Sequence, residues 1–98
     1  MNILLSDDSV LSKIHNYKNP NWIWIEIWEI SQYEIQIVIT INEEKYCHMG
    51  QHKVIRVCSA QTDVNNDIME MKTHGKHITR LIRKNFKNSE VHSSLYYR

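Results

Sequence analysis

The chain has 98 residues, 42% of them hydrophobic and 23% charged, and its formal net charge is +1. This length predicts a single domain over residues 1–98, and the composition is typical of a folded protein rather than a disordered one. Two glycines and two cysteines exclude a disulfide framework and leave little material for a glycine-rich phosphate loop.

The two halves of the chain differ in charge. Residues 1–50 have three lysines against seven carboxylates, a net charge of −4, and residues 51–98 have nine Lys/Arg against four carboxylates, a net charge of +5. We therefore expect an acidic part and a basic part. The N-terminus "MNILLSDDSV" is typical neither of a signal peptide nor of a membrane span, and we expect reduced thiols at Cys47 and Cys58. These features predict a cytoplasmic protein.

The first expected element is a short amphipathic helix over residues 7–18. Its apolar residues follow the polar segment "SDDS" at helical spacing: Val10, Leu11, Ile14 and Tyr17. Two long strands follow at residues 22–30 and 33–42, where isoleucine, tryptophan and valine alternate with polar residues. The segments "KYCHM" and "KVIRVC" predict shorter strands. Because the connections are too short for crossovers, we expect a three- or four-stranded antiparallel meander.

From Asp63 onward the period changes to that of a helix. The apolar stripe falls at spacings of 4, 3, 4, 3 and 4: Val64, Ile68, Met71, Gly75, Ile78 and Ile82. This predicts one long C-terminal helix, or two shorter ones, with Asp63 as its N-cap. Gly75 marks either a close approach to the sheet or a break, and the tail "VHSSLYYR" is either a last strand or a flap. The predicted fold class is α+β, with the helices mainly on one face of the sheet.

The first long strand has two apolar faces. One face has Trp22, Trp24, Glu26 and Trp28, and the other has Ile23, Ile25 and Ile27. The second strand has its core face at the odd-numbered isoleucines from 35 to 41. A loop of two or four residues would place the tryptophans beside these isoleucines, whereas a three-residue loop, Ser31 to Tyr33, pairs Ile27 with Ile37. Glu26 favours the three-residue loop, because burying an unpaired carboxylate is unfavourable.

The tryptophans are therefore expected to face away from the helices. The chain itself is one candidate cover for them, through the N-terminal helix or through Leu95, Tyr96 and Tyr97. A protein partner is the other, since tryptophan is the residue most enriched at binding hot spots. The candidate partner-binding residues are Trp22, Trp24, Glu26, Trp28, Glu34, Gln36 and Thr40. An acidic, aromatic surface of this kind suits a basic protein partner.

A second candidate surface lies on the C-terminal helix. Its basic residues fall away from the apolar stripe: Lys72, Lys76, Arg80, Arg83, Lys84 and Lys87. They form either a solvated helix surface or an alternative nucleic-acid-binding face. Glu26 and Glu34 would repel a nucleic acid strand stacking on the tryptophans.

The spacing of the histidine and cysteine residues does not indicate a metal site or a catalytic site. Two groups combine histidine or cysteine side chains: Cys47, His48, His52 and Cys58, and the pair His74 and His77. Neither matches the paired spacing of structural zinc sites. No phosphate loop or nucleophile elbow is present, so we expect no metal, no cofactor and no enzymatic activity.

In general character the chain resembles the small immunity proteins of bacterial toxin systems, especially those of contact-dependent growth inhibition. The resemblance rests on the single small domain, the absence of catalytic motifs, the segment "WIWIEIW" with Glu26 and Glu34, and the residue usage. Isoleucine occurs 14 times and asparagine nine times, which is typical of AT-rich bacterial genes. The resemblance implies an antitoxin that neutralises a toxin, often a basic nuclease, by direct binding. The alternatives are a small nucleic-acid-binding regulator and a phage-encoded inhibitor of a host defence complex. A further alternative is a homodimer that buries the tryptophan face of the sheet.

Overall fold

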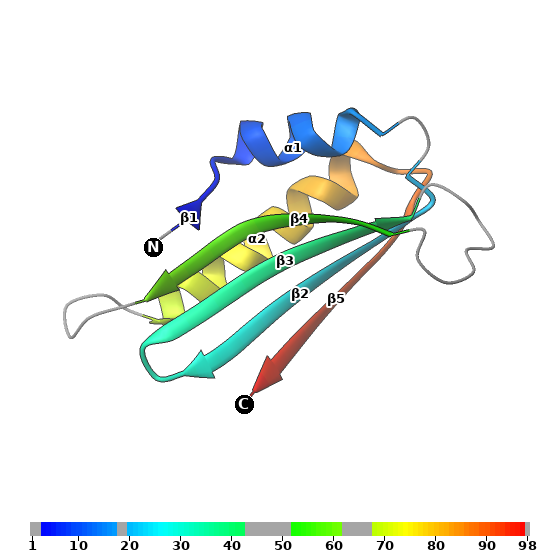
Figure 1. Cartoon of the computed structure of the whole chain (residues 1–98). Coiled ribbons are helices and arrows are strands. Elements are labelled where there is room, and N and C mark those ends of the chain that lie inside the picture. Colours follow the sequence, from blue (N-terminus) through cyan, green and yellow to red (C-terminus); the bar gives the residue numbers. More distant parts are fainter. Residues whose placement is uncertain (1–2, 18–19, 43–51, 62–67, 98) are drawn as a thin grey trace.

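The computed structural model describes residues 3–17, 20–42, 52–61 and 68–97. These form one five-stranded sheet in the order β1-β4-β3-β2-β5 and two helices (Figure 1). The elements are, in chain order, β1 (Ile3–Leu4), α1 (Asp7–His15), β2 (Trp22–Ser31), β3 (Glu34–Asn42), β4 (His52–Gln61), α2 (Ile68–Asn85) and β5 (Glu90–Tyr97).

The α+β class and the antiparallel pairing of β2, β3 and β4 are confirmed, but the sheet is mixed. β5 pairs with β2 in parallel, because α2 returns the chain to the end of the sheet where β2 begins. The prediction of a purely antiparallel meander is therefore wrong, and α2, with its 18 residues, is not the last element. The tail is a strand rather than a flap. "KYCHM" and the proposed N-cap Asp63 lie outside the described residues.

The pairing of β2 with β3 has the predicted register, reached by a different turn. Ile27 lies opposite Ile37. The expected three-residue loop is replaced by a two-residue turn, Gln32 and Tyr33, together with a bulge at Ile30. The bulge adds one residue to β2, so the side chains keep the alternation that a three-residue loop would give.

The core lies between the odd-numbered face of the sheet and the two helices, both on the same side (Figure 1). Its fully buried side chains come mainly from β2 and β3, with α1 and α2 adding four: Val10, Ile14, Ile78 and Ile82. A bulge in β4 at Val57 lets both Val57 and its neighbour Cys58 be buried. Cys47 lies outside the described residues, and the reduced state of Cys47 and Cys58 stays a prediction.

Gly75 marks a close approach, not a break, since α2 is continuous from Ile68 to Asn85. A Cβ atom at this position would lie 2.6 Å from the Cδ1 atom of Ile27 and 3.3 Å from that of Ile37. Glycine therefore lets α2 lie directly on the centre of the sheet. The other helix, α1, begins at Asp7 with Ser6 as its N-cap. The Ser6 side chain accepts a hydrogen bond from the Ser9 N–H, and the helix ends at His15, three residues before the predicted end.

Candidate functional site

The tryptophan face is the side of the sheet opposite the helices. From Trp22 to Trp28 on β2 and from Glu34 to Ile41 on β3, the odd-numbered residues are buried and the even-numbered ones are half-buried, so the alternation continues across both strands. The register places all seven predicted partner-binding residues on this face: Trp22, Trp24, Glu26 and Trp28 on β2, and Glu34, Gln36 and Thr40 on β3. The prediction that the tryptophans face away from the helices is confirmed.

The tryptophan rings are held by contacts along and across the strands. Trp22 and Trp24 meet edge to face, with ring centroids 5.5 Å apart. Trp28 stacks on Tyr96 of β5 at 4.5 Å and an interplanar angle of 16°, and Trp24 lies against His92 of the same strand at 6.1 Å. The parallel pairing of β5 therefore extends the aromatic row by one strand.

Glu26 is fixed within this row rather than left unpaired. Its carboxylate accepts a hydrogen bond of 2.7 Å from the indole N–H of Trp28. Such a bond to an ionised acceptor is stronger than one between neutral groups. Glu26 therefore sets the orientation of the Trp28 ring and keeps a negative charge in the middle of the face.

No described helix lies over the tryptophan face (Figure 1). α1 packs on the opposite side, so of the two alternatives for covering the rings within the chain, the N-terminal helix is excluded. Of the three tail residues considered as a cover, only Tyr96 points to this face, where it stacks on Trp28. Leu95 and Tyr97 alternate to the other side of β5, and the Tyr97 ring lies 5.4 Å from the Lys72 ammonium. The rings thus bury one another in part but stay open to solvent.

The face is acidic and slightly hollowed. A depression of about 220 Å³ lies between β2 and β3, lined by Trp28, Ile30, Gln36 and Val38. Across the register the outward carboxylates are Glu26, Glu34 and Glu90, and Arg56 is opposite Val38. Val38 and His92 were not predicted for this face, and Tyr96 was named only as a candidate cover of the rings, not as part of the binding surface. Val38 follows directly from strand alternation, but the other two depend on the parallel pairing of β5.

The six basic residues of α2 and the turn after it do not form one surface. Lys72 binds Glu29 of β2 at 2.7 Å, with only 14% of its side chain exposed. Lys76, Arg80 and Arg83 line a shallow groove beside β5, together with Thr79 and Ser93. Lys84 and Lys87 are exposed outside this groove. The alternative nucleic-acid face is therefore reduced to three clustered cations.

The ion pair of Lys72 with Glu29 predicts a pH-dependent contribution to stability. The hydrogen bond that the Lys72 ammonium donates to the Glu29 carboxylate raises the pKa of Lys72 above its ordinary value of 10.5. A raised lysine pKa stabilises the fold below pH 10.5 and ceases to do so as the pH rises through the folded-state value. In Glu29→Gln, urea unfolding should show a loss of up to about 1 kcal/mol at neutral pH. The difference from the wild type should vanish above the Lys72 pKa; an equal difference at all pH values would contradict the assignment.

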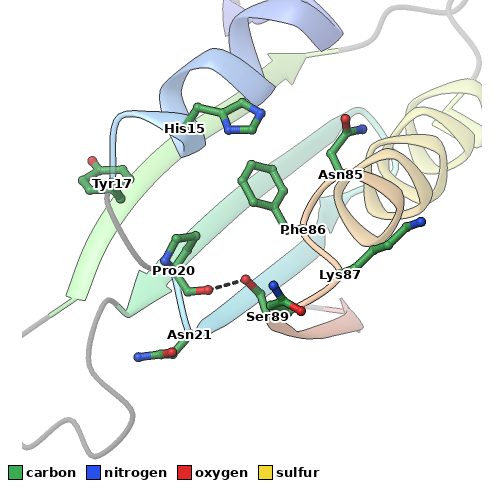
Figure 2. Close-up of a pocket in the computed structure, with 9 residues that line it drawn as sticks. His15, Tyr17, Pro20, Asn21, Asn85, Phe86, Lys87 and Ser89 are labelled. Atoms are coloured by element: carbon green, nitrogen blue, oxygen red, sulfur yellow. Dashed lines mark hydrogen bonds between the residues drawn. The ribbon is translucent and has the colours of Figure 1, made fainter.

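A second hollow, of about 350 Å³, lies where the helices end and β2 and β5 begin (Figure 2). His15 and Phe86 face each other there, with ring centroids 4.6 Å apart. The Ser89 hydroxyl donates to the Pro20 carbonyl, and the Glu90 N–H donates to the carbonyl of the next residue, Asn21, at 2.7 Å. These bonds fix where β5 starts beside β2. This junction therefore sets the register that brings Tyr96 against Trp28.

The two histidines of α2, His74 and His77, lie in different environments. His77 lies 3.0 Å from Asp7 of α1, on the exposed side of α2, whereas His74 is partly buried. Nowhere in the described ranges do three His, Cys, Asp or Glu side chains gather as metal ligands would. Cys47 and His48 lie outside those ranges. Neither α1 nor the described part of α2 is long and apolar enough to cross a membrane.

Comparison with known proteins adds no relative. No protein-family model, curated protein or solved structure matches this chain.

Proposed function

We propose that this chain is a non-enzymatic, protein-binding inhibitor: a cytoplasmic bacterial immunity protein, or antitoxin, that neutralises a basic toxin domain by direct binding. The observation that carries the proposal is the tryptophan face. A row of aromatic rings on β2 and β5 is fixed by stacking and by Glu26, and no described helix covers it. Preordered aromatic rings lose little conformational freedom when a partner covers them.

Tryptophan and tyrosine are among the residues that dominate binding energy at protein interfaces. The outward side chains of β2, β3 and β5 form a continuous surface on one face of a rigid sheet. A specific interface needs about 800 Å² on each partner, and 20 to 30 residues contribute to it. Such a surface favours a flat protein partner over a small molecule, because the depression beside Trp28 is shallow and open.

The charges on the tryptophan face determine which sign of charge a partner surface should have. Glu26, Glu34 and Glu90 project from it, with Arg56 as the opposing cation. Complementary charge speeds association and excludes partners of the same sign. A basic nuclease domain has the required positive surface, and its substrate-binding cleft is where an inhibitor would act.

The charge contribution is tested by Glu26→Gln combined with Glu34→Gln. Glutamine at position 26 keeps an oxygen acceptor for the Trp28 indole while removing the charge, so ring orientation is preserved. We expect the association rate with the toxin to fall severalfold at low salt, and the variant to lose most of the salt dependence that the wild type shows. Stopped-flow fluorescence measures both. A wild-type rate that is indifferent to salt would contradict electrostatic selection of the partner.

Inhibition itself is tested with the purified partner. The immobilised chain retains the toxin from an extract of its own bacterium, and Trp24→Ala/Trp28→Ala serves as the matched control column. The retained protein is then assayed for nuclease activity with increasing amounts of the chain. We expect activity to stop near equimolar ratio with the wild type and to persist with the variant. Full activity in the presence of saturating wild-type chain would refute the inhibitor function.

A nucleic-acid-binding regulator remains the second candidate, favoured by the three cations of the groove beside β5. It requires duplex or single-strand binding that weakens steeply as salt rises. Absence of a mobility shift at low salt would eliminate it. A phage-encoded inhibitor of a host defence complex would use the tryptophan face in the same way, with a different target.

A further inference from the structure

β5 forms one edge of the sheet, and its outer side has no strand beside it in the described structure. The Glu90 N–H donates to Asn21, so Glu90 directs its main-chain groups toward β2. Direction alternates along a strand, and the odd-numbered residues therefore present their N–H and C=O groups to the free edge: Val91, Ser93, Leu95 and Tyr97. The contact of 3.5 Å from the Arg83 guanidinium to the Val91 carbonyl agrees with this direction. Such an edge is a template for another strand.

A row of cations flanks this edge on its helical side. The groove between α2 and β5 is lined by five residues, of which Lys76, Arg80 and Arg83 are basic and none is acidic. The Thr79 hydroxyl contacts both the Gly75 carbonyl at 2.9 Å and the Ser93 hydroxyl at 3.3 Å. The cations are therefore held on a helix that is fixed against the edge strand.

We propose that the free edge of β5 takes an extended acidic segment of a partner protein as an added strand. The outward main-chain groups of Ser93, Leu95 and Tyr97 pair with the segment, and its carboxylates meet Lys76, Arg80 and Arg83. Main-chain pairing supplies affinity in this mode of recognition, and side chains supply specificity. This edge is separate from the tryptophan face and does not depend on the function proposed for it.

Charge argues against a second copy of the chain as the occupant. Two β5 strands paired across a two-fold axis would bring two sets of these three cations onto the same side of one continuous sheet. Like charges so placed are destabilising. Nucleic acid would use the cations but would leave the outward main-chain groups of β5 unpaired.

The test is an NMR titration of the ¹⁵N-labelled protein with a synthetic peptide that alternates valine or threonine with glutamate. We expect shifts at the amides of Ser93, Leu95 and Tyr97, and slower hydrogen exchange there. Two matched peptides separate the contributions: one with lysine in place of glutamate, and one with N-methylated backbone at alternate residues. Each should bind at least tenfold more weakly than the glutamate peptide. Equal binding of the N-methylated peptide would overturn strand addition.

Protein variants of equal charge complete the test. Lys76→Glu/Arg80→Glu should weaken binding of the glutamate peptide at least tenfold. Lys84→Glu/Lys87→Glu makes the same change in net charge outside the groove and should weaken binding much less. Leu95→Pro removes one outward donor without touching the pairing with β2, and it should also weaken binding. No shift at β5 with millimolar peptide, equal effects of the two charge variants, or a dimer that protects β5 would each overturn the proposal.

Discussion

Replacing Ile37 with alanine is expected to lower the free energy of unfolding by about 2–5 kcal/mol. Ile37 is fully buried on the central strand β3, where it lies opposite Ile27 and beneath Gly75 of α2. The helix lies too close to the sheet to move inward, so removing the side chain leaves a cavity. Urea unfolding followed by circular dichroism measures the loss.

The neighbouring residue supplies the matched control. Val38 points to the tryptophan face and is only partly buried. Val38→Ala removes apolar carbon from the same strand, but solvent fills the space, so we expect a loss of about 1 kcal/mol or less. Comparable losses at the two positions would contradict the assignment of the isoleucine face as the core side of β3.

Replacing Trp28 with alanine is expected to weaken toxin binding by about 2 kcal/mol or more, a factor of roughly 30. Trp28 lies on β2, between β3 and β5, where its ring stacks on Tyr96 and its indole N–H donates to Glu26. Its removal takes away a large contact area and leaves the carboxylate without the indole donor. Isothermal calorimetry with the purified toxin domain measures the change.

Tyr97→Ala is the control for this experiment. Tyr97 is also a large aromatic residue of the sheet, 66% exposed, but it points to the helical side. We expect its replacement to leave toxin affinity within about twofold, as for surface positions away from the contact. A Trp28→Ala protein that is folded and binds as tightly as the wild type would place the interface elsewhere.

The orientation of β2 was predictable because one residue broke the symmetry of two apolar faces. Glu26 lies in the middle of the tryptophan side, and a carboxylate there is compatible with a stable fold only if that side is exposed to solvent. The predicted length of the loop between β2 and β3 was wrong, but the strand register that it implied was right. Sequence reasoning required an odd number of inserted residues, and the structure provides it through the bulge at Ile30.

The place of β5 was not predictable from its sequence. "EVHSSLYY" has little apolar alternation, and all but Val91 of its residues are exposed. Its parallel pairing with β2 depends on α2 carrying the chain back and on the bonds from Ser89 and Glu90 at the junction. The local sequence pattern of β5 indicates neither the path of α2 nor these junction bonds.

The same distinction applies to the candidate sites. The seven residues of the tryptophan face follow from alternation on two neighbouring strands, which is local. The basic set was too large because the pairing of Lys72 with Glu29 joins residues far apart in the chain. His92 was missed, and Tyr96 was named only as a candidate cover, for the same reason: the sheet is what brings them beside Trp24 and Trp28.

The most direct test of the open tryptophan face is acrylamide quenching of tryptophan fluorescence, measured on protein shown by sedimentation to be monomeric. We expect all of the emission to be quenched, with a quenching constant between those of free and buried tryptophan, and we expect added toxin domain to protect it. Emission from the free monomer that resists acrylamide would mean that the chain covers its own rings, and would contradict the tryptophan face as the binding surface.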